Sequence, residues 1–142
     1  MARILIVDDD PVFGRLTQRR LERAGHAVGL REGPLGTLAE LKKGSFDLLL
    51  LDLRMPALSG SDIVRMVHAR SSGTRGTKIV LYSNVESDTL ASLASSLGVE
   101  GHASKSAPFT QLVAVIESAL AKSAAPVSVG GERGRSSAYP PR

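Results

Sequence analysis

Residues 4–11 read Ile-Leu-Ile-Val-Asp-Asp-Asp-Pro, four apolar residues followed at once by three acidic ones. The apolar run does not alternate with polar residues, which is typical of a strand that is covered on both faces. A second run of this kind, Leu48–Leu51, ends on Asp52. Strands covered on both faces belong to parallel sheets with helices on either side, so these two segments favour an α/β fold.

The rest of the chain alternates short apolar runs with stretches of helical period. The other strands are expected at Ala27–Leu30, at Ile79–Tyr82 and, more weakly, around Val99–Ala103. The residues expected on the buried faces of five helices are Phe13, Leu16, Leu21 and Ala24; Leu35, Leu38, Ala39 and Leu41; Ile63, Val64 and Val67; Leu90, Leu93, Ala94 and Leu97; and Phe109, Leu112, Val113, Ile116 and Leu120. Strict alternation predicts a five-stranded parallel sheet with right-handed crossovers, and the weak last run predicts an edge strand.

Prolines and glycines mark the expected helix boundaries. Pro11 and Pro108 suit the first turn of a helix, where the missing N–H of proline is not needed. Gly25, Gly44 and Gly98 suit the position just past a helix end, which favours a left-handed backbone.

Composition limits the classes of protein and of site. The chain has no cysteine, which excludes disulfides, thiolate nucleophiles and thiolate metal ligands. It has no apolar run of about 18 residues and no basic-then-apolar leader, so we expect a cytoplasmic protein without a membrane segment.

The last twenty residues, 123–142, differ in composition from the rest. They are rich in Ser, Gly, Pro, Ala and Arg and have no hydrophobic period. We therefore expect one domain over residues 1–122 and a disordered tail or truncated linker over residues 123–142. Three arginines against one glutamate place +2 of the net charge of +4 in this tail, which leaves too little elsewhere to predict nucleic-acid binding.

Polar residues that could bind a ligand or take part in a reaction follow four of the expected strands. Asp8 and Asp9 follow the first, Asp52 the third, Ser83 the fourth and Lys105 the last. Ligands of open α/β sheets bind beyond the carboxyl ends of the strands, so neighbouring strands would bring these side chains together. Carboxylates in one pocket repel, so they need a cation or must take up protons, and ligands that are all oxygen favour Mg²⁺ or Mn²⁺. An aspartate that attacks phosphorus there would form an acyl phosphate.

Each of these residues also has a simpler interpretation. An acidic run after a strand often caps a helix, an aspartate there is often a turn residue, and a serine or lysine is often solvated surface. Caps and turns do not together explain Asp-Asp, Asp, Ser and Lys at four successive strand ends, so the combination favours a functional site.

Two segments resemble a known family. The stretch 4–11 and the segment 52–60, Asp-Leu-Arg-Met-Pro-Ala-Leu-Ser-Gly, together with Ser83 and Lys105, resemble the receiver domains of response regulators in bacterial two-component signalling. The resemblance extends over about residues 3–121. It implies a flavodoxin-like, doubly wound sheet in the order 2-1-3-4-5, and a signalling switch rather than a conventional enzyme.

The resemblance also implies roles for the acidic residues. Asp52 would accept a phosphoryl group from a histidine kinase or a phosphotransfer protein. Asp9, Asp52 and the backbone carbonyl of Arg54 would bind Mg²⁺ or Mn²⁺, with Asp8 acting through water. Lys105 would pair with the phosphoryl group.

Four further positions would make the switch and set its lifetime. Ser83 would swing inward to bond a phosphoryl oxygen. His102 stands where the family has an aromatic rotamer switch, or it is an exposed histidine of the edge strand. The side chains of Arg54 and Val85 would face the hydrolytic water, so Arg54→Ala is expected to change the lifetime of the phosphorylated state.

Partners of this family commonly dock on one face of the domain. That face would comprise the helix around Leu90–Leu97, the last strand and the helix Phe109–Leu120. The first expected helix carries four arginines, which are solvated surface or a kinase docking face: Arg15, Arg19, Arg20 and Arg23.

The sequence departs from the family pattern after Lys105. Ser106 replaces a proline that many receivers have there, and a cis peptide before a non-proline residue costs about 3 kcal/mol, so this loop is expected to be trans or built differently. Ser83 replaces the commoner threonine and keeps the hydroxyl.

Two other functions remain open. A haloacid-dehalogenase-like phosphatase would use Asp8 as nucleophile with Asp10 as its partner, but segment 52–60 and the short chain argue against it. A binding module with the same fold would signal without phosphate. The presence of Asp8, Asp9, Asp52, Ser83 and Lys105 argues against this function, whereas Ser106 leaves it open.

Overall fold

The computed structural model describes residues 1–55, 59–69 and 76–122. Five strands and five helices alternate within this part of the chain: β1 (Arg3–Val7), α1 (Pro11–Arg23), β2 (Ala27–Arg31), α2 (Thr37–Gly44), β3 (Leu48–Leu51), α3 (Gly60–Ala69), β4 (Lys78–Ser83), α4 (Ser87–Leu97), β5 (Gly101–Ser104) and α5 (Phe109–Ala121). The predicted tail, 123–142, lies outside the described residues, so its disorder stays a prediction.

The strands form one parallel sheet in the order β2-β1-β3-β4-β5, which confirms the predicted fold class. β5 is an edge strand, as its weak apolar pattern predicted. In the register of the sheet Val7 pairs with Leu51, so the chain leaves β1 and β3 side by side at Asp8 and Asp52.

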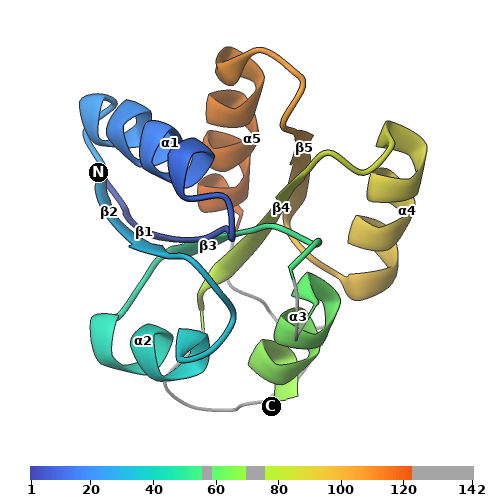
Figure 1. The fold of residues 1–142 in the computed structure, drawn as a ribbon, viewed down its shortest axis with the longest axis horizontal. Coiled ribbons are helices and arrows are strands. Elements are labelled where there is room, and N and C mark those ends of the chain that lie inside the picture. Colours follow the sequence, from blue (N-terminus) through green and yellow to red (C-terminus); the bar gives the residue numbers. More distant parts are fainter. Residues whose placement is uncertain (56–58, 70–75, 123–142) are drawn as a thin grey trace.

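Helices cover both faces of the sheet (Figure 1): α1 and α5 lie on one face, and α2, α3 and α4 on the other. Leu48 and Leu50 point into the cluster beneath α1 and α5, whereas Leu49 and Leu51 point into the opposite cluster. All four are at most 1% exposed, and burial of a leucine stabilises a fold by about 1.5–3 kcal/mol. The apolar run without alternation is therefore explained by two cores.

The buried stripe of α1 differs from the predicted one. Gly14, Thr17 and Leu21 are buried, whereas Leu16 is 45% exposed and Ala24 is exposed. The prediction was right for Leu21, and Phe13 is partly buried against the same core. It missed Gly14 and Thr17 because glycine and threonine do not stand out in an apolar pattern.

At Gly14 the helix closely approaches β2, since a Cβ there would lie 2.9 Å from Leu30 Cδ1. The helix approaches the sheet at the residue that has no side chain.

α2 begins later than its predicted face. Leu35 precedes the helix and is 78% exposed, and Ala39 is also exposed. Thr37 and Leu41 are the buried positions, so only part of the predicted face was right.

Two of the three predicted helix-ending glycines are confirmed. Gly25 (φ 100°) and Gly98 (φ 69°) adopt the left-handed conformation directly past α1 and α4. The prediction for Gly44 was wrong, because Gly44 is the last residue of α2 and Ser45 takes the left-handed position (φ 53°). A Cβ on Gly44 would overlap the ring of Phe46, so a close approach explains this glycine.

The prolines lie at helix starts. Pro11 is the first residue of α1, as predicted. Pro108 is the N-cap of α5, one residue before its first turn. Among the described helices, none is both long enough and apolar enough to cross a membrane.

Candidate functional site

Three carboxylates meet at the carboxyl edge of the sheet. Asp8, Asp9 and Asp52 each offer an oxygen, and these oxygens lie within 4.8 Å of one another. Asp8 is 2% and Asp52 6% exposed, whereas Asp9 is open to solvent. Two carboxylates about 4 Å apart repel by about 4 kcal/mol at an effective dielectric constant of about 20, so the cluster requires a positive charge.

The ammonium group of Lys105 supplies positive charge to this cluster. Its Nζ lies 2.8 Å from Asp8 Oδ2 and 3.3 Å from Asp52 Oδ2, and its side chain is only 8% exposed. Burial by itself would lower the pKa of Lys105, but the hydrogen bond and charge of Asp8, together with Asp52, outweigh it and raise the pKa. Lys105 therefore stays charged.

Phe13 completes the surroundings of this ammonium group, because Lys105 Nζ lies 4.8 Å from the centroid of its ring. Phe13 also packs against Tyr82, with ring centroids 5.6 Å apart. The sequence marked Phe13 only as a core position. A lysine above an aromatic face leaves no signal in spacing, because the two residues come from different elements.

Asp10 has a separate role from the other two acidic residues of its run. Its carboxylate accepts hydrogen bonds from the N–H groups of Val12 and Phe13, both at 3.1 Å, and so caps α1. Asp8 accepts a hydrogen bond from the N–H of Asp10 at 3.0 Å. The capping interpretation thus applies to Asp10. The phosphatase alternative loses support, because it needs Asp10 as the chemical partner of Asp8.

The segment after β3 holds Asp52 through its backbone. Asp52 N–H donates to the carbonyl of Val7 at 3.0 Å, and Arg54 N–H donates to Asp52 Oδ1 at 3.3 Å. The Arg54 side chain is exposed. α3 begins at Gly60, where a Cβ would overlap the backbone carbonyl of Asp52, so this close approach requires a glycine.

Ser83, at the end of β4, is fully buried. Its hydroxyl accepts a hydrogen bond from Val85 N–H at 3.4 Å, and its carbonyl accepts one from Lys105 N–H at 3.0 Å. Val85 is half-buried and packs against the core on the α2, α3 and α4 side. The described residues contain no cis peptide, so Lys105–Ser106 is trans.

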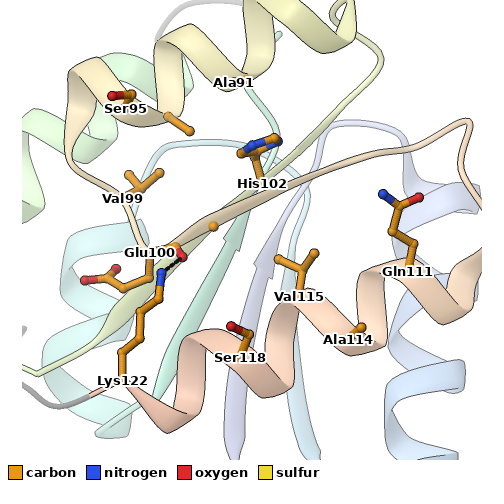
Figure 2. A pocket seen from close by; sticks show the side chains of 12 residues that line it. Ala91, Ser95, Val99, Glu100, His102, Gln111, Ala114, Val115, Ser118 and Lys122 are labelled. Atoms are coloured by element: carbon orange, nitrogen blue, oxygen red, sulfur yellow. Dashed lines mark hydrogen bonds between the residues drawn. The ribbon is translucent and has the colours of Figure 1, made fainter.

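His102 lies on β5 opposite Leu81 and is half-buried rather than exposed. Figure 2 shows its ring in a groove between α4 and α5, beneath Ala91. The groove has a volume of about 530 Å³, and most of the side chains that α4 and α5 contribute to it are small. At its other end Lys122 Nζ donates to the carbonyl of Glu100 at 2.6 Å.

The arginines of α1 have different surroundings. Arg15 lies 3.9 Å from Glu32 in an exposed ion pair, and the Arg20 guanidinium lies 5.2 Å from the centroid of the Phe109 ring. Arg19 is exposed. Arg20 thus helps to join α1 to α5, and Arg15 and Arg19 remain at the surface.

Comparison with known proteins agrees with this fold. The model of the response regulator receiver domain matches residues 4–117. The transcriptional regulatory protein PcoR of Escherichia coli is 34% identical over 84% of this chain and 52% of its own length. The transcriptional regulatory protein CusR of Escherichia coli K12 is 29% identical over 87% of the chain and 53% of its own length.

Among solved structures, the response regulator protein TrrA from Thermotoga maritima, in complex with Mg²⁺ and BeF, is 27% identical with a TM-score of 0.71. The match covers 82% of this chain and 97% of TrrA. The chain belongs to the response regulator receiver domain family. It spans about half the length of the curated relatives that it matches.

Proposed function

We propose that this chain is a phosphoacceptor switch that takes a phosphoryl group from a histidine kinase or a phosphotransfer protein onto Asp52. The observation that carries the proposal is the buried contact of Lys105 with both Asp8 and Asp52. A carboxylate beside one fixed cation and two further carboxylates is suited to phosphoryl transfer, which depends on positioning and on neutralising charge.

A hard dication fits the donor set of this site. Asp8, Asp9 and Asp52 offer only carboxylate oxygens, the ligands that Mg²⁺ and Mn²⁺ prefer, and they offer them within 4.8 Å. We assign Asp9, Asp52 and the backbone carbonyl of Arg54 as direct ligands, with Asp8 acting through water. The bound ion would neutralise charge on the phosphoryl oxygens. The structure of TrrA in complex with Mg²⁺ and BeF supports the choice of Mg²⁺ for this chain.

The proposed reaction at Asp52 has two steps, the formation and the hydrolysis of an acyl phosphate. An oxygen of Asp52 attacks phosphorus, the bond between phosphorus and its donor breaks, and an acyl phosphate forms. Lys105 and the hydroxyl of Ser83 contact the phosphoryl oxygens. Water later returns Asp52 to its carboxylate, at a rate that the side chains of Arg54 and Val85 adjust. The chain thus modifies itself and turns over no separate substrate.

We propose that phosphorylation changes partner binding at the face formed by α4, β5 and α5. A phosphoryl group adds charge and three acceptor oxygens. Contact of Ser83 with one of these oxygens would change the position of the loop after β4. His102 acts as the rotamer switch within the groove of Figure 2. The small residues Ala91, Ala94 and Ala114 line that groove and leave space for a partner's side chain.

The phosphoryl donor is proposed to approach along α1, whose first residues adjoin the site. Val12 is 79% and Leu16 45% exposed, and together with Arg15 and Arg19 they line a surface hollow of about 430 Å³. Exposed apolar residues rimmed by charge are typical of a protein contact.

Incubation with acetyl phosphate and Mg²⁺, followed by intact-mass measurement, tests the proposal. The wild-type chain should gain one phosphoryl group, and Asp52→Ala or removal of the metal with EDTA should abolish the gain. If Asp8→Ala does not react and Asp52→Ala still hydrolyses acetyl phosphate rapidly, the chain is instead the phosphatase. A wild-type chain that neither gains mass nor consumes acetyl phosphate would identify the phosphate-independent module.

A further inference from the structure

A side-chain hydrogen bond joins the loop after β4 to the loop after β5. Ser106 Oγ donates to Asn84 Oδ1 at 3.2 Å, and both residues are exposed. Asn84 directly follows Ser83, and Ser106 directly follows Lys105. The bond therefore connects the two segments that carry the proposed phosphoryl contacts.

The sheet brings these two segments to hydrogen-bonding distance. Ser83 pairs with Ser104 at the end of the parallel ladder between β4 and β5. The N–H of Lys105 donates to the carbonyl of Ser83 at 3.0 Å and continues the ladder past the end of β5. The bond between Ser106 and Asn84 extends the connection one residue further, into the loops themselves.

A tight turn holds the hydroxyl of Ser106 in place. Ser106 N–H donates to Ser104 Oγ at 3.1 Å, and Ala107 N–H donates to the carbonyl of Ser104 at 3.1 Å. A proline at this position would lack the N–H that donates to Ser104 Oγ and the hydroxyl that donates to Asn84 Oδ1, so it could form neither bond.

We propose that the Ser106–Asn84 bond is a positioning device, which holds Ser83 and Lys105 at the spacing at which both contact one phosphoryl group and so prolongs the life of the aspartyl phosphate. The inference rests on the proposed function. Neither Ser106 nor Asn84 touches the phosphoryl group, and each acts through its neighbour. Without the bond, only the backbone hydrogen bond from Lys105 N–H to the Ser83 carbonyl joins the ends of the two loops within the described part of the chain. The β4–α4 loop then moves more freely, so Ser83 contacts the phosphoryl group for less of the time.

The lifetime of the phosphorylated chain tests this inference. Wild type, Ser106→Ala, Asn84→Ala and the double variant are loaded with acetyl phosphate and Mg²⁺, the donor is removed, and loss of the phosphoryl mass is followed in time. Each single variant should lose the group about threefold to tenfold faster, the range that one hydrogen bond of ordinary strength allows. The double variant should be no faster than the singles, because both remove the same bond.

Two further variants separate this role from a general effect on the fold. Ser106→Thr keeps a hydroxyl and should stay close to wild type. Ser96→Ala removes an exposed serine of α4 and should leave the lifetime unchanged. Unchanged lifetimes in both single variants, or effects that multiply in the double variant, overturn the inference, whereas a wild-type chain that gains no phosphoryl group overturns the proposed function.

Discussion

At the scale of single residues, Lys105 connects the most parts of the site. Its ammonium group lies closer to Asp8 (2.8 Å) than to Asp52 (3.3 Å), with the ring of Phe13 beside it. Lys105 thus neutralises two buried carboxylates that a dication would also contact. The protein's own cation and the proposed metal ion would act on the same negative charges.

The first prediction concerns removal of this charge. Lys105→Met keeps the length of the side chain and leaves Asp8 and Asp52 buried without their ammonium partner. Breaking a buried ion pair from one side costs about 3 kcal/mol or more, so the free energy of unfolding should fall by about that amount. Mg²⁺ should raise the free energy of unfolding of Lys105→Met by more than that of wild type, because the ion replaces the missing positive charge. Urea unfolding with and without MgCl₂ measures both effects.

The exposed Lys43 of α2 offers a matched control, because Lys43→Met removes an equal charge far from the carboxylates. It should change stability by less than about 0.5 kcal/mol. Equal stabilisation of wild type and Lys105→Met by Mg²⁺ would contradict the view that ion and lysine share these carboxylates.

At the scale of elements, close approaches decide where helices begin and which face they bury. The prediction for α1 followed Leu16, but the helix meets the sheet at Gly14 and Thr17. α3 in turn begins against the backbone of Asp52 because Gly60 has no side chain there. Neither contact follows from hydrophobic period, since a glycine has no hydrophobic side chain to count.

The second prediction tests the approach of α3. Gly60→Ala places a methyl group against the carbonyl of Asp52, so α3 and Asp52 must move apart. Overpacking of this kind costs about 1–3 kcal/mol, and the rate of phosphorylation by acetyl phosphate should fall with it. Chemical unfolding and the mass assay measure the two effects.

Gly33 gives the matched control, because nothing lies within 4 Å of a Cβ built there and its φ is not positive. Gly33→Ala should leave both stability and phosphorylation close to wild type. If the two alanine variants behave alike, the close approach at Gly60 is not what requires glycine.

At the scale of the whole molecule, two buried groups tie stability to alkaline pH. Burial raises the pKa of Tyr82 above its ordinary value of 10.0. The pKa of Lys105 lies above its ordinary 10.5, since Asp8 and Asp52 outweigh the effect of burial. In both cases the folded state holds its proton more tightly than the unfolded chain.

The third prediction follows from that difference. Below about pH 10 both groups are protonated in either state, and their contribution to stability is fully present. As the pH rises further the unfolded chain releases these protons first, so the free energy of unfolding should fall. Tyr82→Phe removes one of the two groups and should make the fall shallower. Urea unfolding from about pH 8 to about pH 11 measures it, and a free energy that stays level over this range would contradict the prediction.

The sequence by itself determined the order of the elements, the buried strands and the residues at the strand ends. The strand Leu48–Leu51 and the position of Asp52 at its end could be predicted from local pattern alone, because an apolar run followed by a polar residue marks where a buried strand leaves its sheet. The tertiary structure decided that Asp10 caps α1 while Asp8 and Asp9 join Asp52. Only the tertiary structure placed Lys105 nearer Asp8 and joined Ser106 to Asn84. These contacts unite residues of separate elements, and the packing of those elements sets their distances.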